Sequence, residues 1–458
     1  MRGGAISAAS ALLVVATLSV AAAGLLASSS AEVASGPARA AQSIPASGWQ
    51  IEQISGAERT PEDLSFDAVG HAMVTWLGGR GTPSESLYFG ADVREPAGGW
   101  RQVPNPPIQS SNAHMYLYGN GLAQQIGTVY NLSRDREEVL AADGSISGTF
   151  ATPRALSSNG EGVVSAADAA GDAIVAWTKA SKPIGHGHGI VLAERTGGGP
   201  FSSPRTLTLV ERLPLAVGLN PRGERVLVWP QGKALYARIR RPGQPWGPAR
   251  LVSVRLPATT PPGTAVSVAI SPSGTVVLAW EVRFFACGSC LPMLEAVVAV
   301  SGAHGSWRSF TLQRPATATY DVFVSAQIVA LEDTAGRMYV TWNGVSHDAP
   351  VVKFARVGTH GVGPTTVLST GVSEATLLDA AAGPRNALAV SWMATPGHPG
   401  DTPTYVSLRR NGQPFAAPAQ VTSGAGGSGL VAFQPITGQA VVVSAERTGP
   451  QAAISPLG

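Results

Sequence analysis

Residues 270–280 read ISPSGTVVLAW, and six other segments of the chain follow the same pattern. They are FDAVGHAMVTW (66–76), ADAAGDAIVAW (167–177), LNPRGERVLVW (219–229), EDTAGRMYVTW (332–342), AAGPRNALAVSW (381–392) and FQPITGQAVVVS (433–444). In five of the seven a glycine stands six residues before the tryptophan, as Gly274 stands before Trp280. A sixth has Asn386 six residues before Trp392, and asparagine is the residue that best replaces glycine where φ is positive.

Three residues before each of the five glycines stands a residue that suits the first position of a type I turn. These residues are Asp67, Asp168, Asn220, Ser271 and Asp333. A type I turn followed by a left-handed glycine closes a tight β-hairpin with a G1 bulge. The strand after the turn is continuously apolar, so both of its faces must be covered. We assign the acidic pairs Glu62-Asp63 and Glu332-Asp333 to the chemistry of these turns.

Each repeat continues with a variable loop, a third strand, a turn and a fourth strand that carries Trp or Phe, as in RRPGQPWGPARLV (240–252). Counted from Trp177, the following repeats come after 52, 51, 62, 50 and 52 residues. The 101 residues between Trp76 and Trp177 leave room for one degenerate unit at 121–133, with Tyr130 at the tryptophan position. Antiparallel four-stranded units in such a series predict an all-β fold, a β-propeller of about eight blades, with seven as the alternative.

The two ends of the repeat region predict how the ring closes. Residues 47–54 resemble a fourth strand without a blade of its own, and the chain stops at Gly458 before its last unit has a fourth strand. We therefore expect residues 42–458 to form a single β-propeller domain in which the N-terminal strand completes the last blade.

The repeat resembles those of the secreted propeller families, both the Asp-box, sialidase-like group and the group whose hairpins read Pro-Asp-Gly. The likeness spans residues 48–458 and rests on pattern, as in Pro272-Ser273-Gly274. Ser65, Asp67, Gly70 and Trp76 have the residue types of an Asp box, but the Gly and the Trp are displaced from its spacing. The resemblance therefore implies the propeller fold, and it transfers no sialidase activity and no catalytic residue.

Residues 1–41 are predicted to be a signal peptide and linker, because an apolar stretch from Ala5 to Ala27 follows Arg2 and precedes a Ser/Ala/Pro-rich tract. The alternative is an uncleaved membrane anchor, since the apolar stretch could span a bilayer. We expect a secreted or extracellular protein. In that environment Cys287 and Cys290 are predicted to form a local disulfide, with a metal or redox site as the alternatives.

The charge balance excludes a nucleic-acid groove. The chain has 32 Lys and Arg against 29 Asp and Glu, and its cations are not gathered in runs. No P-loop, His-Glu-x-x-His or Gly-x-Ser-x-Gly motif is present, and we expect no cofactor and no metal. We expect a monomer that contacts the membrane only if the signal segment stays attached.

The longer loops, which join the second strand of each blade to the third, carry most of the unusual polar residues. We expect these loops at 77–86, 178–190, 281–293, 343–350 and 393–404, all on one face of the ring. The candidate ligand-binding residues on them are His186, His188, His347, Asp348, His398, Asp401, Phe284 and Phe285. They could converge on a polar ligand such as a glycan, or lie apart as solvated loop residues. His71 and His114 carry no functional signal.

Three roles remain open on the sequence, the third being a purely structural spacer. The pattern favours a non-catalytic module that binds a cell-surface protein or polysaccharide. The alternative is a glycan-active hydrolase or lyase with an acid and a base at the central channel. For that alternative the acids of interest are Glu211, Asp321 and Glu374, all in or near the loops that connect blades.

Overall fold

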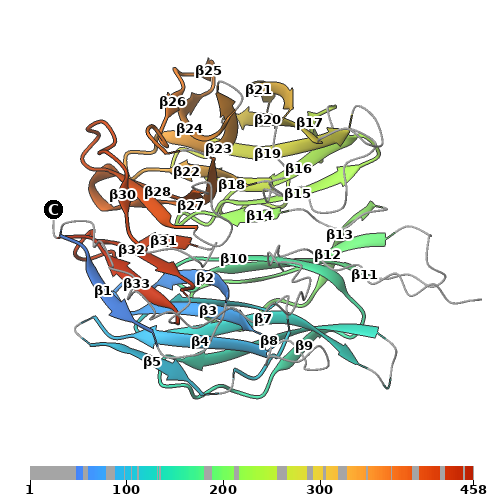
Figure 1. The fold of residues 1–458 in the computed structure, drawn as a ribbon. Helices are drawn as coiled ribbons and strands as arrows, with labels where there is room; N and C mark the ends of the chain where they lie inside the picture. Colours follow the sequence, from blue (N-terminus) through green and yellow to red (C-terminus); the bar gives the residue numbers. More distant parts are fainter. Residues whose placement is uncertain are drawn as a thin grey trace, which may run out of the picture.

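Eight antiparallel sheets form a ring, as the sequence predicts, so the chain is an eight-bladed β-propeller and the seven-bladed alternative is wrong (Figure 1). The structure, a computed structural model, describes residues 48–54, 60–78, 88–96, 98–104, 106–110, 113–131, 133, 136–179, 188–210, 216–254, 266–285, 292–302, 306–317, 327–346, 349–372, 374–394, 402–422, 429–446 and 449–456.

Blades 1 to 4 each contain four strands that follow one another in sequence. Blade 1 is β2 (Thr60–Phe66), β3 (Ala72–Gly78), β4 (Tyr88–Arg94) and β5 (Trp100–Val103). Blade 2 is β6 (His114–Tyr118), β7 (Leu122–Asn131), β8 (Arg136–Ser145) and β9 (Arg154–Ser157). Blade 3 is β10 (Glu161–Ala167), β11 (Ala173–Lys179), β12 (His188–Arg195) and β13 (Arg205–Val210). Blade 4 is β14 (Ala216–Leu219), β15 (Arg225–Gln231), β16 (Ala234–Arg240) and β17 (Arg250–Ser253).

Blades 5 to 7 repeat this order, and blade 8 takes its outer strand from the start of the chain. Blade 5 is β18 (Val266–Ile270), β19 (Val276–Phe285), β20 (Pro292–Ser301) and β21 (Trp307–Thr317). Blade 6 is β22 (Ile328–Glu332), β23 (Met338–Ser346) and β24 (Ala349–Gly358), with β25 (Gly361–Val362) and β26 (Thr366–Val367) both paired to β24. Blade 7 is β27 (Ala375–Gly383), the 3-10 turn η1 (Pro384–Asn386), β28 (Ala387–Ala394), β29 (Thr404–Arg409) and β30 (Ala419–Gln420). Blade 8 is β31 (Gly429–Phe433), β32 (Ala440–Ser444), β33 (Gln451–Ile454) and β1 (Gln50–Gln53).

The first strand of each blade lies innermost. β31 contacts both β27 and β2, β2 contacts β6, and the series β10, β14, β18, β22 and β27 continues around the ring. Blades 2 and 3 meet where the Tyr116 hydroxyl of β6 donates a hydrogen bond to the Ser165 carbonyl of β10 at 3.0 Å. Side chains on these inner strands therefore decide the chemistry of the central axis.

The ring closes through β1, which pairs antiparallel with β33 from Gln50 opposite Ile454 to Gln53 opposite Gln451. Figure 1 shows the blue β1 beside the red β32 and β33. Ile54 follows β1 and is 1% exposed in the apolar cluster between blades 8 and 1. Glu52 also holds blade 1, because its carboxylate accepts two hydrogen bonds from Arg94 at 2.8 and 2.9 Å. The predicted closure is confirmed.

The predicted turns are present. The five repeat glycines have φ between 74° and 93°, and Asn386 has φ 61° in the same role. In the first turn the Gly70 amide donates to the Asp67 carbonyl at 3.2 Å, and the Asp67 carboxylate accepts the amides of Val69 and His71. The polar residue before each glycine therefore satisfies backbone donors of its own turn. Asp333 does the same for Ala335 and Arg337, which confirms turn chemistry at that position.

Six tryptophans lie on the second strands of their blades, and each is 0% or 1% exposed. Trp280, for example, packs in a cluster with residues of blades 4 and 5. The prediction for blade 2 was wrong. The left-handed glycine of this blade is Gly121, so Gly127 stands at the tryptophan position, next to the buried Ile108, while Tyr130 lies further along β7 and is 53% exposed.

The strands also run further than the sequence predicts. Phe284 and Phe285 were expected in a loop but are the last residues of β19, where Phe285 pairs with Pro292. His188 was likewise expected in a loop and is the first residue of β12, opposite Val210. A continuous ladder here satisfies backbone groups that a loop would leave to water.

Replacing Gly223 tests the turn geometry directly. Gly223 has φ +83°, and a Cβ added there would meet no atom within 4 Å, so the substitution probes the backbone alone. We expect Gly223→Ala to lower the free energy of unfolding by about 1–2 kcal/mol, and Gly223→Asn to cost less. Chemical denaturation of the two variants measures the difference. Equal stability of Gly223→Ala and the parent protein would contradict a left-handed turn at this position.

Candidate functional site

Most of the predicted site residues lie outside the described residues. This holds for His186, His347, Asp348, His398, Asp401, Cys287, Cys290, Glu211 and Asp321. Of the others, His188, Phe284 and Phe285 belong to strands, as above, and Glu374 stands just before β27 with φ 53°. Convergence of the loop residues on one ligand, and the disulfide, therefore stay predictions.

The inner strands bring together a different set of polar residues, which we call the channel cluster: Glu62 and Asp63 of β2, His114 and Tyr116 of β6, Ser165 of β10, and Asp379 of β27. Two sequence interpretations are wrong here. Glu62 and Asp63 do not serve a turn, because the turn begins at Asp67 and they belong to the innermost strand. His114, which carried no signal, has a carboxylate partner in this cluster.

A β-bulge precedes both aspartates of the cluster. In blade 1 the pairing of β2 with β3 shifts between Pro61 and Asp63, and in blade 7 that of β27 with β28 shifts between Leu377 and Asp379. Each bulge inserts one extra residue and turns the following side chain to a new direction. Asp63 and Asp379 also stand at the same place in their blades, four residues before Asp67 and Gly383. The bulge is therefore a repeated local device that places a carboxylate on the inner strand.

Asp63 and His114 form the central pair, with 3.1 Å between the Asp63 Oδ2 and the His114 Nδ1. Their side chains remain 31% and 38% exposed, so they are accessible to solvent and to a small ligand. The His114 ring stacks on Tyr116, whose hydroxyl also lies 2.9 Å from the Ser165 Oγ. The Asp63–His114 pair is thus accessible to a ligand, whereas the Tyr116 hydroxyl is already hydrogen-bonded.

Asp379 is held by backbone donors. Its Oδ2 accepts the Val431 amide of the next blade at 2.9 Å, and its Oδ1 accepts the Ala380 amide at 2.8 Å. The carboxylate therefore joins blade 7 to blade 8 at the inner strand. Desolvation nevertheless raises its pKa to about 7, against the lowering effect of these hydrogen bonds and with a further increase from the charge of Asp63.

Protonation in the cluster depends on burial and on neighbouring charges. Desolvation, followed by repulsion from Asp63, raises the pKa of Glu62 to about 7, and His114 only partly offsets this. Desolvation lowers the pKa of His114, but the charge and hydrogen bond of Asp63 and the charge of Glu62 outweigh it and leave this pKa raised. Burial also raises the pKa of Tyr116. Proton acceptors and donors that titrate near neutrality thus lie together on the inner strands.

These pKa shifts predict a pH-dependent stability. Between about pH 4.5 and 7 the folded chain binds more protons at Glu62 and Asp379 than the unfolded chain, so the free energy of unfolding falls as pH rises. The raised pKa of His114 acts in the same direction. We expect Glu62→Gln to reduce the difference in stability between pH 5 and pH 8, measured by chemical denaturation. An unchanged difference would show that Glu62 does not titrate in this window.

The described residues contain no group of three or more His, Cys, Asp or Glu that could hold a metal ion. Within the same part of the chain, no helix is long and apolar enough to cross a bilayer. The cluster can offer hydrogen bonds and proton transfer, and its carboxylates favour hydroxyl-rich or cationic ligands over anions.

No protein-family model and no curated protein matches the chain. Among solved structures it is similar to an ulvan lyase of a new polysaccharide lyase family, at 10% identity over 88% of this chain and 94% of the other, with a TM-score of 0.44. The β-propeller domain of the Trilobed protease from Pyrococcus furiosus matches at 10% identity over 76% and 94%, with a TM-score of 0.42. A puromycin hydrolase matches at 13% identity over 85% and 58%, with a TM-score of 0.46. Likeness at this level concerns the architecture alone and transfers no activity.

Proposed function

We propose that this chain is an exported β-propeller that binds a cell-surface polysaccharide or protein without transforming it. The observation that carries the proposal is the exposed Asp63–His114 pair on the inner strands, beside Glu62. Such a group offers donors and acceptors to sugar hydroxyls, and its carboxylates disfavour an anionic ligand in the channel. The proposed contact surface also includes His188 at the start of β12 and the predicted loop residues His186, His347, Asp348, His398 and Asp401. We further propose a relationship to the secreted Asp-box or Pro-Asp-Gly families.

One observation favours a second candidate, a glycoside hydrolase. Glycoside hydrolysis uses two carboxyl groups, one protonated as the acid and one ionised. Glu62, with a pKa of about 7, stands next to Asp63, whose carboxylate lies 3.1 Å from the His114 ring nitrogen. Tyr116 is not suited to be the base of a lyase, because burial raises its pKa.

A glycan array read for both binding and release of reducing ends separates the two candidates. Binding without release, weakened at least tenfold by Asp63→Asn, is the expected result. Glu138→Gln on the third strand of blade 2 is the control, because it changes a carboxyl group away from the inner strands. Turnover that is lost in Glu62→Gln would overturn the binding proposal in favour of hydrolysis. If Asp63→Asn leaves binding unchanged, the channel cluster takes part in neither the proposed binding nor the proposed hydrolysis.

A further inference from the structure

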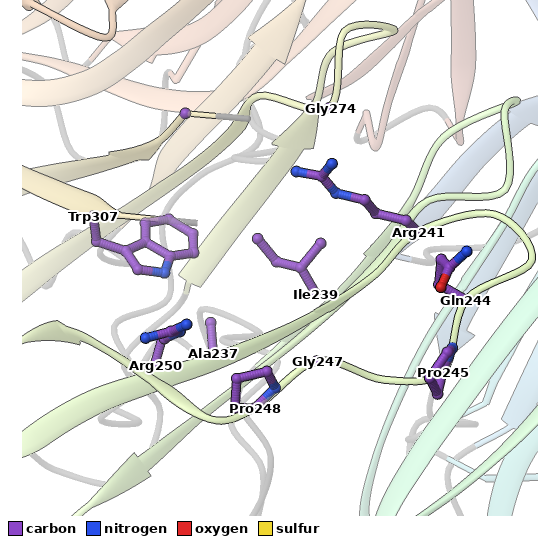
Figure 2. Close-up of a pocket in the computed structure, with 11 residues that line it drawn as sticks. Ala237, Ile239, Arg241, Gln244, Pro245, Gly247, Pro248, Arg250, Gly274 and Trp307 are labelled. Atoms are coloured by element: carbon purple, nitrogen blue, oxygen red, sulfur yellow. The ribbon is translucent and has the colours of Figure 1, made fainter. Parts of the chain in front are cut away.

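A cavity of about 380 Å³ lies between blades 4 and 5, apart from the channel cluster. Residues of β16 and of the turn from β16 to β17 form one part of its wall, and Gly274, Gly302 and Trp307 of blade 5 form the other. Figure 2 shows Arg241 extending over Ile239 toward Gly274, with Trp307 and Arg250 on the other side of Ile239. Its size lies within the range of small-molecule sites, about 300–1,000 Å³.

Two guanidinium groups of this cavity have no ion-pair or hydrogen-bond partner among the described residues, namely those of Arg241 and Arg250. The neighbouring arginines differ. Arg205, Arg225 and Arg240 all donate to the Glu194 carboxylate, at 2.6 to 2.9 Å. Glu224, whose carboxylate approaches Gly274 at the cavity, accepts a hydrogen bond from the Asn220 amide at 2.7 Å. The cavity therefore keeps two cations available for an anionic ligand.

Apart from Gln244, the remaining wall is apolar and includes one aromatic ring. Trp307 is half-buried and its indole Nε1 is buried, so the protein holds the ring in place. Ile239, Pro245 and Pro248 add apolar surface. An indole next to arginine side chains suits a ligand that has a flat apolar face and a carboxylate, because guanidinium groups bind carboxylates through two parallel hydrogen bonds.

We propose that this cavity binds two adjoining hexuronate units of an acidic polysaccharide, with the C–H face of one pyranose ring on Trp307 and its carboxylate at Arg250, and with the carboxylate of the next unit at Arg241. Each unit of such a chain combines an apolar ring face with a single negative charge. The proposal goes beyond the channel site, since the two sites have opposite charge and share no residue. Its failure would leave the channel proposal intact.

Titration calorimetry with the trimer of galacturonic acid tests the assignment, with the neutral trimer of galactose as the matched ligand. We expect saturable binding of one acidic trimer per chain, weakened by added salt, and at least tenfold weaker binding of the neutral trimer. The double variant Arg241→Gln/Arg250→Gln should lose at least tenfold in affinity. Arg308→Gln is the control, because Arg308 is exposed and adjacent to Trp307 on β21, so its side chain points to the opposite face of the strand.

Each other outcome overturns the proposal. These outcomes are absence of binding, equal affinity for the neutral trimer, or unchanged affinity in the double variant. Equal binding of a short peptide that ends in a free carboxylate would show that the cavity recognises a carboxylate without the sugar. Asp63→Asn should leave binding of the acidic trimer unchanged, which separates this site from the channel cluster.

Discussion

Deletion of residues 48–54 is expected to abolish the folded monomer. These residues contain β1, so their loss would leave β33 as an open edge with unpaired backbone groups over four residues. It would also remove Ile54 from the cluster that it shares with Trp76 and Val443. Truncation of a buried isoleucine alone costs about 2–5 kcal/mol, and whole proteins are stable by only about 5–15 kcal/mol.

Thermal unfolding and size-exclusion chromatography measure this effect. The matched control is a deletion that ends at residue 47 and keeps β1, for which we expect the unfolding temperature of the parent protein. A milder variant, Ile54→Ala with Glu52→Gln, keeps the backbone ladder and removes the side-chain contacts with blade 1. It should remain folded at a lower unfolding temperature. A folded, monomeric protein of parental stability after removal of 48–54 would contradict closure through β1.

Trp280→Ala is expected to lower the free energy of unfolding by about 3–5 kcal/mol. Trp280 is 0% exposed and packs between blades 4 and 5. Its indole Nε1 has no hydrogen-bond partner among the described residues, so the substitution removes packing and leaves no acceptor stranded. Trp76 differs because its Nε1 donates to the buried Asp92 at 2.7 Å, and replacing it would add that loss.

Trp280→Phe keeps an aromatic ring in the same space and should cost less than Trp280→Ala. Denaturation curves of the two variants give the comparison. If Trp280→Ala lowers the free energy of unfolding by less than about 1 kcal/mol, the indole ring does not stabilise the contact between blades 4 and 5.

The architecture could be predicted because each repeat carries its own turn chemistry. A left-handed Gly274 or Asn386 and a buried tryptophan six residues later are local requirements that are visible without any knowledge of neighbours. Blade 2 was recognised by spacing, but its tryptophan position was misassigned to Tyr130. The reason is that Gly127 stands at the tryptophan position, six residues after the left-handed Gly121, so no aromatic residue marks it.

The channel cluster could not be predicted in the same way, because it joins strands of blades 1, 2, 3 and 7. Asp63 and His114 are 51 residues apart, and only ring closure brings blade 7 near blade 1. One signal was present in the sequence. Asp63 and Asp379 are acidic residues four positions before a turn, on strands that lie innermost, and this position differs from the turn acids such as Asp333.

The two proposed sites differ in the charge of the ligand that they suit. The channel cluster presents carboxylates with one histidine, whereas the cavity between blades 4 and 5 presents two arginines and an indole. A surface polysaccharide that contains both neutral and acidic sugars could contact both sites, and variants at one site should not change binding at the other.

A cysteine pair across the closing strands tests the ring most directly. Gln53 and Gln451 face each other in β1 and β33, and their side chains already meet at 3.4 Å, although the residues are 398 positions apart in sequence. We predict that Gln53→Cys/Gln451→Cys forms a disulfide in the folded protein, identified by peptide mapping, whereas the off-register pair Gln50→Cys/Gln451→Cys does not. A folded protein that links 50 to 451, or that leaves both cysteines of the matched pair free under oxidising conditions, would contradict the closed eight-bladed ring.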